Sequence, residues 1–142
     1  MNKIEHGLYL GNLQAAYDLQ ALKNAGITHI LQVASGIKPL YPKDFVYKTI
    51  SVTDVKSANL IRHFPAANSF IKSAIQSGGV LVHCFAGVSR SATCVIAYMM
   101  QERKLSFQEA FAYVSKRRPI IFPNMGFQRQ LQEFENLLAL QH

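Results

Sequence analysis

Residues 91–100 form a stretch that is apolar on nearly every side, and this feature constrains the fold more than any other. A helix without a polar face has to be covered all round, so it belongs in the middle of a globular protein. The stretch follows a short, fully apolar strand at residues 80–82, which leads into His83, Cys84 and a loop containing Gly87. We therefore expect this strand, loop and helix at the centre of the molecule.

Strands and helices alternate along most of the chain. The pattern predicts strands at residues 7–11, 28–33 and 45–52, a helix at 13–25 closed by Gly26, and a helix from about residue 60 ended by Gly78 and Gly79. Ser106 and Glu109 have the spacing of a capping box and open a helix that reaches about Lys116, where Arg118-Pro119 breaks it. A final helix carries a stripe of four apolar residues, Phe127, Leu131, Phe134 and Leu138.

This alternation predicts an α/β sandwich around a partly parallel sheet. The 142 residues contain no repeat and no linker-like segment, so we expect one domain covering residues 1–142. Open α/β sheets bind ligands beyond the carboxyl ends of their strands, and the loop after Val82 is at such an end.

The chain is basic, with 15 Lys and Arg against 8 Asp and Glu and a net charge of +7. That excess favours anionic partners, whether phosphorylated molecules, acidic protein segments, nucleic acid or an anionic membrane surface. The densest run of basic residues is only residues 116–118, which we interpret as solvated surface.

The two cysteines, Cys84 and Cys94, do not make a disulfide framework, and no His lies at metal-ligand spacing from either.

The sequence shows none of three targeting signals. The first residues lack the pattern of a secretory signal, and Asn2 excludes N-myristoylation of the chain as written. No apolar run approaches the ~18 residues of a membrane span. We therefore expect a reducing, cytoplasmic or nuclear setting.

The segment from Cys84 to Arg90 combines residue types that hold and attack a phosphate group. Successive N–H groups of a turn before a helix can point inward as an anion nest, and the positive end of the helix dipole adds to it. Arg90 can close the ring with a planar guanidinium that binds two phosphate oxygens at once. The same field favours a thiolate at Cys84, a nucleophile for in-line attack that yields a phosphocysteine and then, with water, free phosphate. No metal or other cofactor is required.

His83-Cys84, five residues and then Arg90-Ser91 resemble the signature of the cysteine-based protein phosphatases. The variant in residues 86–92 is similar to the dual-specificity branch, which hydrolyses phosphotyrosine and phosphoserine or phosphothreonine. Residues 7–11, 97–100, 123–127 and Gln130-Leu131 also match, so the resemblance extends from about Ile4 to Glu135 and is closest to small single-domain members. It implies a three-layer sandwich with a central mixed, mostly parallel sheet of about five strands flanked by helices, as in phosphotyrosine phosphatases.

The resemblance also assigns roles to individual residues. Phosphate is bound by the loop residues Phe85, Ala86, Gly87, Val88 and Ser89 together with Arg90. Asp54 follows a predicted strand at the point where the family places its general acid, the alternative being a turn or cap residue. Ser91 helps Cys84 leave during hydrolysis of the intermediate, and as a lone serine it also suits a helix N-cap.

Four further residues are interpreted as supporting or structural. His83 orients and hydrogen-bonds the loop, whereas direct proton transfer is the less favoured role. Asn124 matches a family residue that braces the loop, although Asn after Pro is also an ordinary turn residue. Cys94 is assigned to core packing, with a redox role toward Cys84 as the alternative. Tyr98 and the two methionines after it are assigned to the core, and His6, His29 and His63 are treated as structural.

Other phosphate esters and a binding role are the alternatives. Lipid-specific relatives usually carry lysines inside the loop, where Phe85 and Val88 lie here, and RNA-directed relatives typically have Arg-Thr-Gly instead of Arg90-Ser91-Ala92. A catalytically dead module that binds phosphoproteins usually lacks the Cys or the acid. The resemblance therefore implies phosphorylated proteins as substrates, with no nucleic-acid partner and no membrane span, and the sequence leaves the oligomeric state open.

Overall fold

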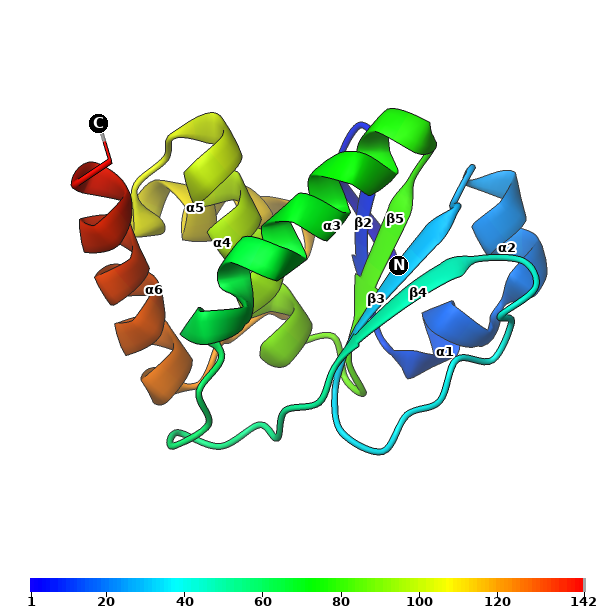
Figure 1. Ribbon diagram of the computed structural model, residues 1–142, viewed down its shortest axis with the longest axis horizontal. Coiled ribbons are helices and arrows are strands. Elements are labelled where there is room, and N and C mark those ends of the chain that lie inside the picture. Colours follow the sequence, from blue (N-terminus) through cyan, green and yellow to red (C-terminus); the bar gives the residue numbers. More distant parts are fainter. Residues whose placement is uncertain (142) are drawn as a thin grey trace.

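The computed structural model describes residues 1–141, and a five-stranded sheet forms its middle layer (Figure 1). The strands are β1 (Asn2–Glu5), β2 (Leu8–Gly11), β3 (His29–Val33), β4 (Val46–Ile50) and β5 (Val80–His83). Their order across the sheet is β1-β2-β5-β3-β4. Only β1 and β2 pair antiparallel, while the pairs β2–β5, β5–β3 and β3–β4 are parallel. The prediction of a mixed, mostly parallel sheet of about five strands is confirmed.

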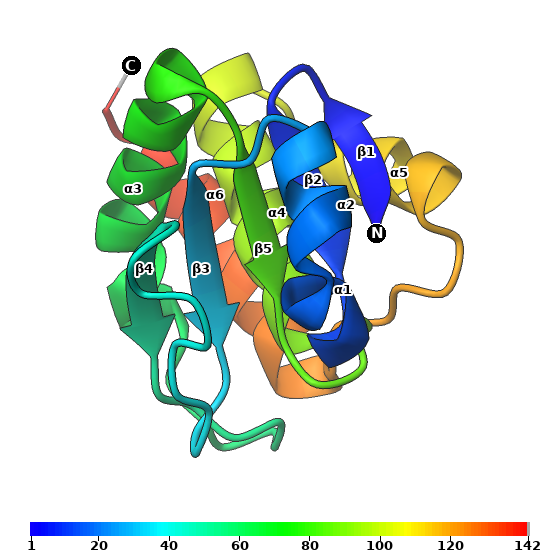
Figure 2. The same cartoon turned by 90° about the vertical axis from the view of Figure 1, so that its right-hand side faces the viewer.

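Helices cover both faces of this sheet. They are α1 (Leu13–Tyr17), α2 (Leu19–Asn24), α3 (Phe64–Ser77), α4 (Arg90–Arg103), α5 (Phe107–Arg117) and α6 (Met125–Ala139), with a 3-10 turn η1 (Ile61–His63) before α3. α1 and α2 lie on one face, and α3 and α4 lie on the other (Figures 1 and 2). α5 and α6 pack against the outer side of α4, which completes the predicted three-layer sandwich.

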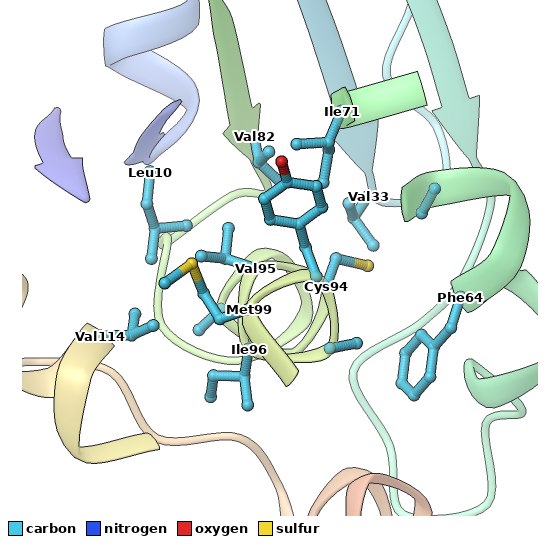
Figure 3. Packing of buried hydrophobic residues seen from close by; sticks show 14 of the residues in the cluster. Leu10, Val33, Phe64, Ile71, Val82, Cys94, Val95, Ile96, Met99 and Val114 are labelled. Atoms are coloured by element: carbon cyan, nitrogen blue, oxygen red, sulfur yellow. The ribbon is translucent and has the colours of Figure 1, made fainter. Parts of the chain in front are cut away.

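Helix α4 is the centre of the main hydrophobic core, as its apolar sequence predicts. All ten of its residues from Ser91 to Met100 are buried. Figure 3 shows Cys94, Val95 and Met99 of this helix among side chains of the sheet and of neighbouring helices. Burial of each large apolar side chain contributes roughly 1.5–3 kcal/mol, so this contact anchors β5 and α4 firmly relative to each other. A smaller cluster around Leu22 and Leu81 lies under α2.

The N-terminal third differs from the prediction at two points. β1 was not predicted, and the single helix expected at residues 13–25 is two helices. The chain leaves helical geometry at Asp18 (φ −89°, ψ 84°), whose backbone N–H bonds to the Ala15 carbonyl at 3.3 Å. The Asp18 carboxylate then accepts from the Ala21 N–H at 3.1 Å and so caps α2. Asp18 is thus both the C-cap of α1 and the N-cap of α2, and the predicted single helix is divided there.

The parallel strands bring three loops to one edge of the sheet. The carboxyl ends of β2, β5, β3 and β4 all lie at this edge because these strands run in the same direction. The loop at residues 84–89 follows β5, the loop at residues 51–60 follows β4, and the turn into α1 follows β2. Among the helices of residues 1–141, none combines the length and apolar character needed to cross a bilayer.

Candidate active site

The loop between β5 and α4 is held by bonds to its carbonyl oxygens, all of which are directed at surrounding groups. Backbone N–H groups hold two of these carbonyls: Leu13 N donates to Phe85 O (3.0 Å) and Phe122 N donates to Val88 O (2.8 Å). Side chains hold the other three: Arg118 donates through Nη2 to Ala86 O (3.3 Å) and through Nε to Gly87 O (2.8 Å), and Thr93 Oγ1 donates to Ser89 O (2.7 Å). In a trans peptide the next N–H points opposite to the carbonyl, and the described chain has no cis peptide. The loop amides are therefore turned inward, which is the arrangement of an anion nest.

Gly87 makes this turn possible. Its φ of +68° lies in the left-handed region, which side chains other than glycine adopt at a cost. A Cβ atom built on Gly87 would also lie 2.6 Å from the carbonyl oxygen of Gly11, at the end of β2. In this conformation the backbone N–H of Gly87 donates to the sulfur of Cys84 at 3.2 Å.

Cys84 follows β5 directly, and its sulfur lies at the floor of the loop. The residue is only 2% exposed. Besides the Gly87 N–H, the hydroxyl of Ser91 lies 3.1 Å from the sulfur. The alternative of Ser91 as a helix N-cap is wrong, because the N-cap position of α4 is Ser89 and Ser91 is the second residue of the helix. The Ser91 hydroxyl is placed to interact with the thiol.

Arg90 begins α4 and stands beside the mouth of the loop. Its Nη1 donates to the Val52 carbonyl at 3.1 Å, which fixes one side of the guanidinium. The guanidinium also lies over the ring of Phe85, 5.4 Å from the ring centroid. Its Nε atom is buried and has no hydrogen-bond partner within residues 1–141. A buried donor without an acceptor is costly, so this edge of the guanidinium is suited to an anionic ligand.

Asp54 lies in the loop after β4 and reaches across to the loop between β5 and α4. Its Oδ1 accepts from the Ser89 hydroxyl at 2.8 Å and from the Asn124 side-chain amide at 2.9 Å. The residue is exposed, and within the described chain Oδ2 has no partner. The structure therefore brings Asp54 to the loop of Cys84, and neither a helix cap nor a local turn accounts for its contacts.

The N-terminus of α6 holds the Asp54 loop in place. Asn124 is the N-cap of this helix, not a turn residue, and accepts from the Phe127 N–H at 2.9 Å while its side-chain amide holds Asp54. Gly126 allows close approach, because a Cβ there would lie 2.0 Å from the Lys56 carbonyl oxygen. Gln130 adds bonds to three backbone groups of the loop and η1, namely Leu60 N (2.8 Å), Ile61 N (2.9 Å) and Ala58 O (2.7 Å).

Most of the chain matches a known protein family. Residues 8–137 match the family described as "Dual specificity phosphatase, catalytic domain". The chain belongs to the dual specificity phosphatase family. Dual specificity protein phosphatase 1 of Arabidopsis thaliana is 47% identical over 138 residues, which are 96% of this chain and 70% of that protein.

Two human structures superpose closely on this member of the dual specificity phosphatase family. The tyrosine phosphatase-like serine/threonine/tyrosine-interacting protein gives a TM-score of 0.95 at 41% identity and covers 98% of this chain and 97% of its own. DUSP28 gives a TM-score of 0.95 at 32% identity and covers 100% of both chains. The resemblance read from the sequence and the fold that it implied are both confirmed.

His83 supports the loop of this phosphatase domain from below. It is fully buried, its Nδ1 lies 3.3 Å from the Cys84 carbonyl, and its Nε2 lies 3.3 Å from the Gln32 side-chain oxygen. Burial lowers the pKa of His83 to about 4, so the ring is neutral near pH 7. This placement fits the predicted orienting role.

Arg118 is a site residue that the sequence reasoning missed. The run at residues 116–118 was interpreted as solvated surface, and for Arg118 this is wrong because only 8% of it is exposed. Its guanidinium holds two loop carbonyls and also donates to the Asn2 side chain at 2.7 Å. Burial lowers the pKa of Arg118, and the nearby Cys84 opposes that shift. No salt bridge links Arg118 to a carboxylate in the described chain. Among the three basic residues of this run, Arg118 is marked only by the proline that follows it, which signals the end of a helix and not burial.

The remaining candidates lie away from the loop. Cys94 is fully buried in the core, where burial raises the pKa of its thiol, and the structure records it and Cys84 as free cysteines (Figure 3). Its packing role is confirmed, and its redox role stays a prediction. Tyr98 and the two methionines after it are buried as predicted. Within residues 1–141, no His, Cys, Asp and Glu side chains gather as a set of metal ligands.

Proposed function

We propose that this domain hydrolyses phosphate monoesters on proteins, phosphotyrosine and also phosphoserine or phosphothreonine, through a phosphocysteine intermediate on Cys84. The observation that carries the proposal is the position of the Cys84 sulfur, 3.2 Å from the Gly87 N–H at the floor of a loop with inward amides. Such a floor stabilises negative charge on the sulfur and directs it at a phosphorus atom bound above.

In the first step the Cys84 sulfur attacks phosphorus while the bond from phosphorus to the leaving oxygen breaks. The loop amides and the unpartnered edge of Arg90 bind the three equatorial oxygens, where the negative charge lies. The Asp54 carboxyl group gives its proton to the leaving oxygen and so releases an alcohol or phenol. Its Oδ1 is occupied by Ser89 and Asn124, which leaves Oδ2 to carry that proton.

In the second step water attacks the phosphorus of phosphocysteine, and the bond between sulfur and phosphorus breaks. The Asp54 carboxylate takes a proton from the water, which restores the acid form for the next cycle. The Ser91 hydroxyl, 3.1 Å from the sulfur, stabilises the negative charge that returns to Cys84. Because thiolates are readily oxidised, we propose a reducing compartment, the cytoplasm or nucleus, as the working environment.

The loop itself supports a single phosphate group as ligand. Arg90 is the only basic residue from Cys84 to Arg90, so the loop has no second cation for the further phosphates of an inositol headgroup or a triphosphate. The presence of Cys84, Arg90 and Asp54 together supports turnover over a phosphoprotein-binding role.

Turnover of p-nitrophenyl phosphate in the presence of EDTA tests the proposal. The wild type should release phosphate, and Cys84→Ser should remove activity while retaining the fold, because a neutral hydroxyl replaces the nucleophile. Arg90→Ala should weaken both turnover and vanadate binding. Binding of a phosphopeptide without turnover by the wild type, abolished in Arg90→Ala, would show a binding module instead.

A further inference from the structure

The segments that hold Cys84, Asp54 and Asn124 carry four large apolar side chains that are exposed to solvent. Val55 and Phe85 are each 47% exposed, Met125 is 49% exposed and Phe122 is 60% exposed. We call these four residues the apolar rim. Exposed apolar side chains that gather in one place commonly mark a surface that binds a partner.

Backbone and side-chain contacts fix each member of the apolar rim next to the catalytic groups. Phe85 follows Cys84 and lies under the Arg90 guanidinium. Phe122 donates its N–H to the Val88 carbonyl at 2.8 Å. Val55 and Met125 follow Asp54 and Asn124 respectively, and those two residues are hydrogen-bonded to each other at 2.9 Å. The rim therefore comes from three separate segments that meet at the loop after Cys84.

Charge is sparse in the same segments, although the chain as a whole is strongly basic. Residues 85–89 and residues 119–128 contain no charged side chain, whereas the net charge of the chain is +7. In the loop after β4, Asp54 and Lys56 are the charged residues between positions 51 and 59. Electrostatic attraction between the rim and parts of a substrate other than its phosphate is therefore weak. The rim side chains can bind a substrate mainly through apolar contacts.

We propose that the apolar rim selects phosphorylated protein segments with large apolar side chains next to the phosphorylated residue. This inference rests on the proposed function, because a phosphate bound above Cys84 forces the flanking residues of its chain to cross the rim. When an apolar side chain of the substrate packs against Phe122 and Met125, the apolar surface of the substrate and that of the rim are both removed from water, which favours binding. A polar flanking residue makes no such favourable contribution to the binding free energy. The rim is continuous with the catalytic loop, so its occupant is the substrate itself.

Two phosphotyrosine peptides of equal length and charge provide the test. One carries leucine before and phenylalanine after the phosphotyrosine, and the other carries serine at both positions. We expect the wild type to show a kcat/KM about tenfold higher for the apolar peptide, the size typical of one modest apolar contact in a pocket. The double variant Val55→Ser/Met125→Ser, which leaves the loop donor Phe122 in place, should reduce this ratio to about two.

The control is Leu137→Ser/Leu140→Ser, which changes two exposed apolar residues, 45% and 83% exposed, at the opposite end of α6. It should keep the wild-type ratio. Turnover of p-nitrophenyl phosphate, which has no flanking residues, should change less than about twofold in both double variants. A wild type that does not turn over p-nitrophenyl phosphate would refute the proposed function. A wild type that turns it over but shows no peptide preference would refute only the rim proposal.

Three results would overturn the rim proposal. The wild type could process both peptides equally, or the Val55→Ser/Met125→Ser variant could keep the full preference. Alternatively, the wild type could bind vesicles of phosphatidylcholine with or without phosphatidylinositol phosphate, and the variant could lose this binding while its peptide ratio stays at the wild-type value. That outcome would assign the rim to a lipid surface.

Discussion

At the scale of single residues, the proposed chemistry divides between a sulfur and a carboxyl group held on different loops. Asp54 is fixed to the Cys84 loop through Ser89 and Asn124 and has one oxygen left for the leaving group. Asp54→Asn should therefore matter most when the leaving oxygen is strongly basic. We expect kcat/KM for phenyl phosphate to fall about 10²–10³-fold, and that for an aryl phosphate with a very acidic phenol to fall less than about tenfold. Equal losses in a leaving-group series would show that Asp54 is not the acid.

Arg118 is the second residue whose role can be isolated. Arg118→Met leaves the carbonyls of Ala86 and Gly87 without their donor, and such losses typically cost ~1–3 kcal/mol of unfolding free energy. We expect kcat/KM for p-nitrophenyl phosphate to fall about 10–100-fold, less than the roughly 10²–10³-fold cost of removing one donor outright, because the loop amides are displaced but still present. Urea unfolding and steady-state kinetics measure the two effects.

Arg118→Lys and Arg117→Met are the controls for this experiment. Lysine keeps the charge but not the forked bonds, so recovery of activity by Arg118→Lys would assign the effect to charge. Arg117 lies over the Tyr113 ring and away from the loop, and Arg117→Met should stay within about twofold of wild type. Identical behaviour of Arg117→Met and Arg118→Met would contradict a role for Arg118 in bracing the loop.

The difference between these two arginines shows what the sequence could not predict. Cys84 and Arg90 are identifiable because a strand, a six-residue spacing and a following helix fix their relative positions, and Asp54 is identifiable because it follows a predicted strand at the point where the family places its acid. Arg118 is the C-cap of α5, with φ −138° and ψ 89°, so helical periodicity no longer sets its direction. Its burial follows from contacts with Asn2, at the other end of the chain. No local pattern encodes such a contact.

At the scale of elements, apolar periodicity was a good guide wherever burial is strong. The strands β3 and β5 and the helix α4 were predicted because their residues are almost all buried. β1 was missed because Ile4 is the only buried residue among its four, which leaves no pattern to detect. The break at Asp18 was missed because an aspartate at a helix surface and an aspartate that caps a helix look alike in sequence.

The contact of α6 with the Asp54 loop gives a prediction for an element. Gly126→Ala places a Cβ against the backbone of Lys56, so α6 and the loop have to move apart. Alanine is otherwise the better helix residue, which makes a loss of function informative. We expect kcat/KM for phenyl phosphate to fall about tenfold or more, with a smaller loss for an aryl phosphate that needs no acid.

A double-mutant cycle tests whether this loss passes through the acid. In the Asp54→Asn background, Gly126→Ala should add little to the defect, because the group that it displaces is already inactive. Additive losses in the double variant would mean that Gly126→Ala acts by general destabilisation. Urea unfolding of the single variant provides the matching measure of stability.

At the scale of the whole molecule, the active site depends on segments from nearly the entire chain. The Asn2 side chain contacts Arg118, and Asn124 at the start of α6 holds Asp54. The backbone N–H groups of Leu13 and Phe122 hold the loop. These contacts connect the site to both ends of the sequence. The folding stability of the domain and the geometry of the site are therefore properties of the same set of contacts, and a buried group beneath the loop should affect both.

His83 makes stability depend on pH. Its pKa is about 4 in the folded protein because burial disfavours the charged ring, against the ordinary value of 6.5. Between these two values the unfolded chain binds a proton that the folded chain does not, so the free energy of unfolding falls as the pH falls. Between pH 7.5 and pH 5 this histidine alone should remove about 2 kcal/mol of stability. Above pH 7 both states are neutral at His83, and it contributes no pH dependence.

Urea unfolding at pH 7.5, 6.5 and 5 measures this effect in the wild type and in His83→Gln. Glutamine can still hydrogen-bond near the Cys84 carbonyl but does not titrate, so the variant should be less stable at pH 7.5 yet lose about 2 kcal/mol less on acidification. The difference between the two curves isolates His83 from all carboxylates, which titrate alike in both proteins. Parallel curves over this range would mean that His83 takes up its proton equally in the folded and unfolded states, so that burial does not lower its pKa.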